Sequence, residues 1–381
     1  MKSAYLDNAA TTPVHPEVSE AILESLKENF GNPSSTHSFG RKAKAAVENA
    51  RKEIAKLFNV SAANIIFTSG GTEADNMSIN CAVRDLGVQR IISSKIEHHA
   101  VLNCVEFLNL ENKVKLEFID LDENGSVDLF HLESLLAQEN QPKTLVSLMH
   151  INNEVGNILD IKKVGEICQK YDAIFHCDTV QSVGHYQLDL SEIPVDFVAV
   201  SAHKFHGPKG VGFLYVKQRK NLKPLIHGGS QERELRAGTE SVHNIIGLQK
   251  ALELAYKHLE EDQKYIKNLK KYFITKLKSN FPEAKFNGLS GDLEKSTYTL
   301  VNVSLPVAQS EADMMLFQLD LKGVACSKGS ACQSGAQQGS FVLNEIYGTN
   351  LKHPGIRFSF SKFNTEAELD YVISVLKEFS N

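Results

Sequence analysis

Residues 195–204 read Val-Asp-Phe-Val-Ala-Val-Ser-Ala-His-Lys, a short apolar segment that runs into small residues and then a lysine. An apolar run of this length, bounded by turn-forming residues, is typical of a strand that is buried on both faces. A lysine just past the end of such a strand is kept partly out of water, which makes its amine nucleophilic. The stretch therefore predicts a buried strand that presents the reactive amine of Lys204.

Six further apolar segments of strand length surround this one, and stretches of helical periodicity separate them. They are residues 65–67, 90–93, 114–118, 144–148, 173–177 and 211–216. This alternation predicts an α/β fold with a mostly parallel, seven-stranded sheet and helices on both faces. Apolar residues at helical spacing predict helices from Glu17, over 43–57 and over 248–277.

The length of the chain predicts two lobes, because 381 residues exceed what one hydrophobic core usually supports. Residues 16–250 contain the alternation of strands and helices and are predicted to form the large lobe. Residues 251–381 contain strand-like segments at 298–303 and 356–360 and a closing helix from Thr365. We expect this last third to form a smaller α+β lobe.

Charge and hydropathy exclude several classes of protein. The formal net charge is -5, which leaves no excess of positive charge to hold nucleic acid stably. No apolar run reaches the roughly 18 residues that span a bilayer, and the N-terminus shows no apolar leader. We therefore expect a cytoplasmic protein that is not bound to a membrane.

The six cysteines include no Cys-x-x-Cys pair and no His/Cys cluster at zinc spacing, which predicts neither a disulfide framework nor a metal site. Four lie in apolar contexts and are expected to be buried: Cys81, Cys104, Cys168 and Cys177. Cys332 differs, because residues 327–340 are small and polar and are typical of an exposed, mobile loop. An exposed thiol is reactive, whereas Cys326 adjoins apolar residues and is expected to be structural.

Two further segments point to chemistry at strand ends. Residues 68–73, Thr-Ser-Gly-Gly-Thr-Glu, follow a strand and open a helix, the context in which backbone N–H groups bind a phosphate. Gly71 and Thr72 are the candidates, although Gly-Gly-Thr also serves simply as a helix cap. Asp178 lies at the end of strand 173–177, where ligands dock on an open α/β sheet.

Lys204, Asp178 and Cys332 together resemble the NifS/IscS-type cysteine desulfurases, a branch of the class V aminotransferase superfamily. The resemblance runs from Tyr-Leu-Asp-Asn-Ala-Ala-Thr-Thr-Pro, residues 5–13, to Arg357. It implies the pyridoxal phosphate (PLP) fold type I, with residues 1–15 joining the small domain 251–381 and its mobile catalytic loop, 326–340. It also implies conversion of L-cysteine to L-alanine, with the sulfur left on Cys332 as a persulfide for iron–sulfur cluster assembly or thiolation.

The resemblance assigns residues to the ring of the cofactor. Lys204 matches the lysine that binds PLP covalently, and Asp178 matches the acid that keeps the ring nitrogen protonated. His98 matches an imidazole that stacks on the ring and moves protons. Gln181 and Asn153 match contacts to the phenolic oxygen, and Asn153 also contacts the substrate; on the residues alone, Asn153 is equally a turn asparagine.

The resemblance also assigns the phosphate and the substrate carboxylate. The phosphate contacts are Gly71, Thr72, Ser201 and His203. Thr239 matches a threonine that reaches the phosphate of the other subunit, which implies a homodimer. Arg357 matches the residue that grips the α-carboxylate of L-cysteine; the alternative is an ion pair with a nearby Asp or Glu. The expected sulfur acceptor is a protein such as an iron–sulfur scaffold or a sulfur carrier.

Three other functions stay open at this point. A selenocysteine lyase would cleave its substrate without Cys332, and another class V aminotransferase would need a keto-acid acceptor. A catalytically inactive scaffold would lack the lysine or the ring acid, but Lys204 and Asp178 are both present.

Overall fold

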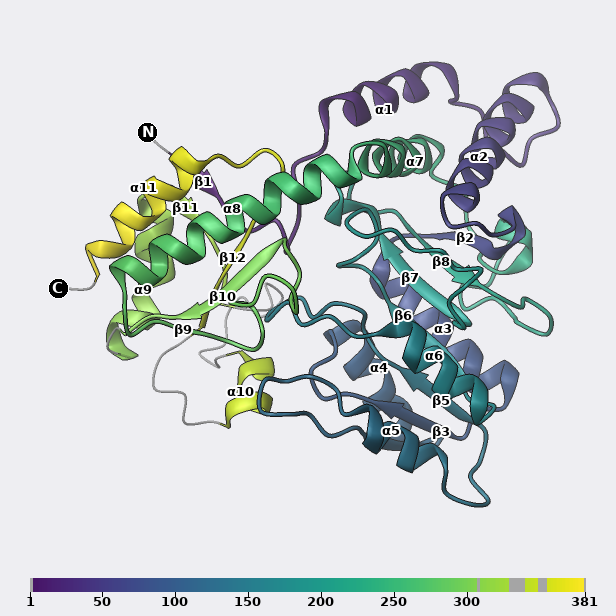
Figure 1. Cartoon of the computed structure of the whole chain (residues 1–381). Helices are drawn as coiled ribbons and strands as arrows, with labels where there is room; N and C mark the ends of the chain where they lie inside the picture. Colours follow the sequence, from purple (N-terminus) through teal and green to yellow (C-terminus); the bar gives the residue numbers. More distant parts are fainter. Residues whose placement is uncertain (1–2, 307–308, 329–339, 349–354, 380–381) are drawn as a thin grey trace.

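The computed structural model describes residues 3–306, 309–328, 340–348 and 355–379. Figure 1 shows a larger part built on the central sheet and a smaller part in which β1 and α11, near the two ends of the chain, lie together. In the described part of the chain, no helix combines the length and the apolar character needed to cross a membrane.

The central sheet has the strand order β2-β8-β7-β6-β5-β3-β4. Its strands are β2 (Ile65–Thr68), β3 (Arg90–Ser93), β4 (Lys115–Phe118), β5 (Thr144–Ser147), β6 (Ile174–Asp178), β7 (Phe197–Ser201) and β8 (Gly212–Val216). Only β8 runs antiparallel to its neighbours, β2 and β7. The predicted seven-stranded, mostly parallel sheet is confirmed.

Helices cover both faces of this sheet. One face packs against α3 (Gly71–Leu86) and α4 (His99–Leu110). The other packs against α1 (Pro16–Glu28), α2 (Ser38–Leu57), α5 (Leu129–Leu136), α6 (Ile161–Lys170) and α7 (Val242–Lys257). Phe175 and Cys177 of β6 belong to this second layer. Because side chains alternate along a strand, His176 and Asp178 face α3.

The predicted helix over 248–277 is wrong in one respect, because two helices occupy this region. They are α7 and α8 (Leu259–Asn280), and His258 between them has φ -109° and ψ 15°. α7 buries Leu248 and Leu252 against the central sheet, whereas α8 buries Leu269 and Phe273 in the smaller part. The chain turns here because the two apolar faces belong to different cores, a change of partner that periodicity does not reveal. The division into lobes at residue 250 stays a prediction.

The smaller part contains an antiparallel sheet in the order β12-β10-β9. Its elements are β9 (Lys285–Phe286), β10 (Leu300–Ser304), β12 (Gly355–Ser359), α9 (Gln309–Leu321), α10 (Phe341–Tyr347) and α11 (Glu366–Lys377). β1 (Ala4–Tyr5) pairs with β11 (Val324–Ala325) in this part. The chain after β1 then crosses to the central sheet, where Thr12 N donates to His203 O at 2.9 Å. The N-terminal segment thereby joins the small sheet to the region around Lys204.

Candidate active site

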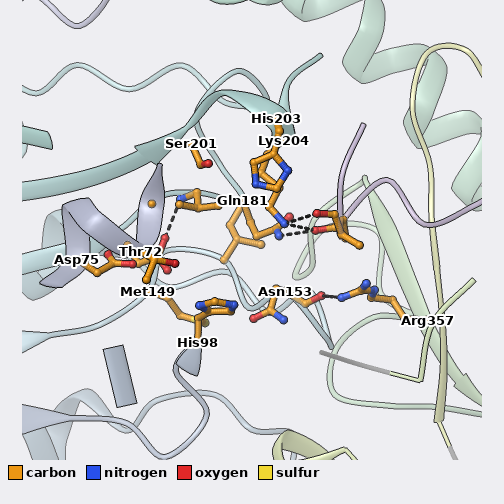
Figure 2. Close-up of a pocket in the computed structure, with 16 residues that line it drawn as sticks. Thr72, Asp75, His98, Met149, Asn153, Gln181, Ser201, His203, Lys204 and Arg357 are labelled. Atoms are coloured by element: carbon orange, nitrogen blue, oxygen red, sulfur yellow. Dashed lines mark hydrogen bonds between the residues drawn. The ribbon is translucent and has the colours of Figure 1, made fainter. Parts of the chain in front are cut away.

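A cavity of about 220 Å³ lies between the carboxyl edge of the central sheet and β12. Its lining is Ala9, Ala10, Gly71, Thr72, Asp75, His98, Met149, Ile151, Asn153, Asp178, Val180, Gln181, Ser201, His203, Lys204 and Arg357. Figure 2 shows Thr72 and Asp75 at one end, Arg357 at the other and Lys204 between them. Every predicted site residue therefore lines this cavity except two. Thr239 is exposed elsewhere, and Cys332 lies outside the described residues.

Lys204 is placed by the turn that follows β7. It ends a short 3-10 helix, η2 (Ala202–Lys204), directly after the buried strand that the sequence predicted. Its Nζ donates hydrogen bonds to Ala9 O at 2.7 Å and to Ala10 O at 2.8 Å. Gln181 Nε2 donates to the same Ala9 oxygen at 3.0 Å. The N-terminal segment thus holds both side chains at the cavity wall through backbone carbonyls.

Asp178 ends β6 and forms an acidic wall of the cavity. Its Oδ1 accepts a hydrogen bond from Val180 N at 2.8 Å, and the residue is 7% exposed. Burial raises the pKa of Asp178 to about 6, against the opposing effects of that hydrogen bond and of the Lys204 charge. A carboxyl group in this setting binds a cationic N–H group favourably, because the cation stabilises its ionised form.

His98 occupies the wall opposite Lys204 and His203 (Figure 2). It is the N-cap of α4, and its Nδ1 accepts a hydrogen bond from Ala100 N at 3.1 Å. Burial lowers the pKa of His98 to about 4, with smaller contributions from Lys204 and His99. The ring is therefore neutral at neutral pH and carries its proton on Nε2. A neutral ring with one N–H group is suited to stack on a flat ligand and donate to it.

The end of the cavity away from Arg357 is formed by the start of α3. Gly71 opens the helix after β2, as the strand, turn and helix pattern predicted, and no side chain among the described residues caps it. A Cβ on Gly71 would come within 2.7 Å of Val180 Cγ2, so the backbone packs closely against the β6 end. The Ser201 hydroxyl lies beside Gly70. Uncapped N–H groups and a hydroxyl at a helix N-terminus suit a phosphate.

Arg357 lies in β12 and is 1% exposed. Its Nη1 donates to Asn153 O at 2.8 Å, and its Nη2 donates to Asp7 Oδ1 at 2.9 Å. The acidic partner that the sequence left open as an alternative therefore exists, and it is Asp7. Arg357 nevertheless lines the cavity, so the ion pair and a role toward a ligand carboxylate are compatible.

The burial predicted for four of the cysteines is confirmed. Cys81, Cys104, Cys168 and Cys177 are buried. Burial raises the pKa of Cys326 to about 12, so its thiol is almost entirely protonated at neutral pH.

Sequence reasoning missed several residues of this site, among them Asp75, Ala9 and Ala10. Asp75 lies one helical turn after Gly71, so the i, i+4 spacing on α3 was a signal that could have identified it. Ala9 and Ala10 contact Lys204 through backbone oxygens alone, and no residue type marks such a contact in advance.

Comparison with known proteins identifies the family of this chain. The family model of the class-V aminotransferases matches residues 4–372. The chain therefore belongs to the class-V aminotransferase family and, within it, to the cysteine desulfurases of the NifS/IscS type. Enzymes of this family generally depend on PLP. The predicted family and fold are confirmed.

Particular relatives cover nearly the whole chain. The cysteine desulfurase IscS of Dictyoglomus turgidum is 42% identical over 379 residues, which are 99% of this chain and 94% of that protein. A solved NifS-like protein is 34% identical with a TM-score of 0.89 and covers 99% of each chain. A structure of SspA in complex with cysteine is 28% identical with a TM-score of 0.79, covering 95% of this chain and 100% of the other.

Proposed function

We propose that this chain is a PLP-dependent cysteine desulfurase, which converts L-cysteine to L-alanine and passes the sulfur to Cys332. The observation that carries the proposal is the order of groups along one cavity. The uncapped start of α3 lies at one end and Arg357 at the other, and Lys204 lies between them. This order matches a ligand that carries a phosphate, a reactive carbonyl and an amino-acid carboxylate.

The residues present fit PLP. Gly71, Thr72, Ser201 and His203 would hold the phosphate, and the absence of a side-chain cap on α3 in the described chain leaves backbone donors for it. Asp178 would hold the ring nitrogen, His98 would stack on the ring, and Gln181 and Asn153 would lie near the phenolic oxygen. When bound, the cofactor supplies an electron sink for the electrons of the substrate Cα–H bond.

The chain's own groups perform the remaining steps. Arg357 and Asn153 orient the substrate carboxylate, and the Lys204 amine takes the Cα proton. The Cys332 thiolate attacks the substrate sulfur, so that an S–S bond forms as the Cβ–S bond breaks. The bonding pair stays with Cβ, which takes up a proton to become the methyl group of L-alanine. One thiol and one L-cysteine therefore yield one persulfide and one L-alanine.

Cys332 lies outside the described residues, but described residues on either side of its segment contact Arg357, which lines the cavity, and Glu154, the neighbour of a lining residue. Ser327 pairs its backbone with Arg357, with N···O distances of 2.6 and 3.2 Å. Ser340 donates from its hydroxyl to the Glu154 carboxylate, next to Asn153 in the chain. Both contacts lie at or next to residues that line the cavity, which supports the role proposed for Cys332. Transfer onward would go to an acceptor protein, such as an iron–sulfur scaffold or a sulfur carrier.

We further infer a homodimer, because Thr239 is exposed and does not line the cavity of its own chain. In a dimer this threonine would be available to the phosphate bound by the partner subunit.

The proposed function is tested on the purified full-length protein. We expect a yellow protein whose absorbance band disappears on borohydride reduction, with the cofactor fixed on Lys204. L-cysteine should yield equal amounts of L-alanine and bound sulfur, and reductant should release sulfide. Reduction that fixes the cofactor on another lysine would overturn the assignment of Lys204. Release of pyridoxamine phosphate with a keto acid would overturn the proposed activity in favour of an aminotransferase. Activity restricted to selenocysteine would favour a lyase.

A further inference from the structure

A line of polar side chains runs beneath the cavity on the face of the sheet that packs against α3. His176 and Asp178 of β6 point to this face, and Ser147 of β5 occupies the corresponding position beside His176. All three are buried, and Asp75 of α3 closes the line from the helix side at 1% exposure. Figure 2 shows Asp75 beside Thr72, at the end of the cavity away from Arg357.

His176 links Ser147 to Asp75. Its Nδ1 lies 2.8 Å from Ser147 Oγ, and its Nε2 lies 3.3 Å from Asp75 Oδ1. Neither Nε2 nor Oδ1 has a hydrogen-bond partner in the described part of the chain, and both atoms are buried. If Ser147 donates to Nδ1, the neutral ring points its N–H group at the Asp75 carboxylate. The His176 ring therefore lies beside that carboxylate, 3.3 Å away, and can restrict its position.

Two buried acids, Asp75 and Asp178, line this cavity, and Glu97 is buried close enough to influence Asp75 without lining the cavity itself. Asp75, Asp178 and Glu97 are all at least nine-tenths buried. Burial, and then the charges of Asp178 and Glu97, raises the pKa of Asp75 well above its usual range. Burial lowers the pKa of His176 to about 3, so the imidazole supplies no positive charge at neutral pH. Asp75 and Asp178 line the same cavity and influence each other's ionisation, so a cation bound at Asp178 would favour the ionised form of both carboxyl groups.

We propose that Asp75, which lies beside His176, is a positioning residue that acts through Asp178 and strengthens the binding of a cationic heteroaromatic ring at this end of the cavity. The proposal rests on the proposed function, because it takes Asp178 as the partner of the ring nitrogen. A single carboxylate suffices to hydrogen-bond one N–H group. A cation favours the ionised form of the second carboxyl group, which then adds negative charge to the same cavity, and a buried carboxylate near a cation typically shifts the proton equilibrium of the pair by about one unit or more.

The test uses full-length apoprotein and two probes, PLP and its deaza analogue, in which a C–H group replaces the ring nitrogen. The deaza analogue keeps the phosphate and the aldehyde but cannot carry the ring proton. The readout is the ratio of the two dissociation constants, measured by absorbance titration. We expect Asp75→Asn to reduce the preference for PLP by about tenfold, the equivalent of one unit of pKa, and to leave binding of the deaza analogue nearly unchanged.

His176 provides a second pair of variants that does not depend on how well Asp75→Asn folds. His176→Gln can place its amide N–H near the position of Nε2 and should keep the preference. His176→Leu removes that donor and should lose part of it. The matched control is Asp85→Asn, the same change on the same helix, at a residue paired with Arg84 away from the cavity.

These measurements distinguish a failure of the role proposed for Asp75 from a failure of the assignment of Asp178 to the ring nitrogen. If Asp178→Asn lowers the preference while Asp75→Asn and His176→Leu leave it at the wild-type value, the role of Asp75 is wrong and the assignment of Asp178 stands. If wild-type apoprotein binds both probes equally and Asp178→Asn changes nothing, the assignment of the ring nitrogen to this end is itself wrong.

Discussion

Arg357 of β12 donates a hydrogen bond of 2.9 Å from its Nη2 to Asp7, a residue 350 positions earlier in the chain. Its Nη1 donates to Asn153 O, so the smaller part, the N-terminal segment and the loop after β5 meet at one guanidinium. Because both Nη1 and Nη2 donate hydrogen bonds, the planar guanidinium group is oriented before a ligand binds, which favours recognition of a carboxylate.

Arg357→Lys should therefore weaken the binding of L-cysteine. Lysine keeps the charge but loses the two-pronged geometry, and hydrogen bonds to charged groups are worth about 1.5 to 3 kcal/mol, so KM should rise about tenfold or more. We expect a smaller change in kcat. Steady-state formation of L-alanine measures both constants. Arg84→Lys, on the surface of α3, is the matched control, and an unchanged KM in Arg357→Lys would count against the carboxylate role.

Asp178→Asn should slow the chemical step. The amide cannot stabilise a positive charge on the ring nitrogen, and loss of an opposite charge beside a cation is worth about one to three pKa units, so kcat should fall about tenfold to a thousandfold. KM should change less. Single-turnover kinetics with saturating L-cysteine isolates this step. Asp189→Asn in a surface turn serves as the control, and full turnover in Asp178→Asn with PLP bound would contradict the assignment.

Cys332→Ser should abolish formation of L-alanine and persulfide, because the attacking thiolate is removed. Cys326→Ser should keep most activity, since burial holds the pKa of the Cys326 thiol at about 12 and leaves almost no thiolate. Mass spectrometry of the cysteine-treated protein should locate the extra sulfur on the peptide that contains Cys332. Sulfur found on Cys326, with Cys332→Ser still active, would refute this mechanism.

Lys270 makes the stability of the fold depend on pH. The residue is fully buried in α8, and its Nζ donates to Ser296 Oγ and Thr297 O, each at 2.7 Å. Burial lowers the pKa of Lys270 to about 7. In the unfolded chain the pKa of this lysine is about 10.4. Between pH 7 and pH 10 the unfolded state therefore binds more protons than the folded state, and the free energy of unfolding rises with pH over this range.

Lys270→Met should remove that contribution. Between pH 7 and pH 9 we expect the free energy of unfolding of the wild type, measured by urea titration, to rise relative to that of the variant by at most about 1.4 kcal/mol per pH unit. Lys267→Met, at a partly exposed residue of the same helix, is the control and should follow the wild type. Parallel midpoints for wild type and Lys270→Met across this range would show that Lys270 stays charged in the folded protein.

The central sheet could be predicted because each of its strands is a local apolar run flanked by turn residues or helical periodicity. The same holds for the placement of Lys204, Asp178 and Gly71, which lie where a strand ends or a helix begins. The helix break at His258 could not be predicted from the sequence, because α7 and α8 both have helical periodicity and differ only in the core against which they pack.

The sequence by itself determined the class of fold and most of the predicted residues at the cavity. Short-range periodicity and the residue types at strand ends depend only on residues that are close together in the chain. The tertiary structure alone decided that Asp7 pairs with Arg357 and that the carbonyl oxygens of Ala9 and Ala10 hold Lys204. It also decided that Asp75 meets His176. These contacts join segments far apart in the chain, and the packing of the small sheet and of α3 against the central sheet sets them.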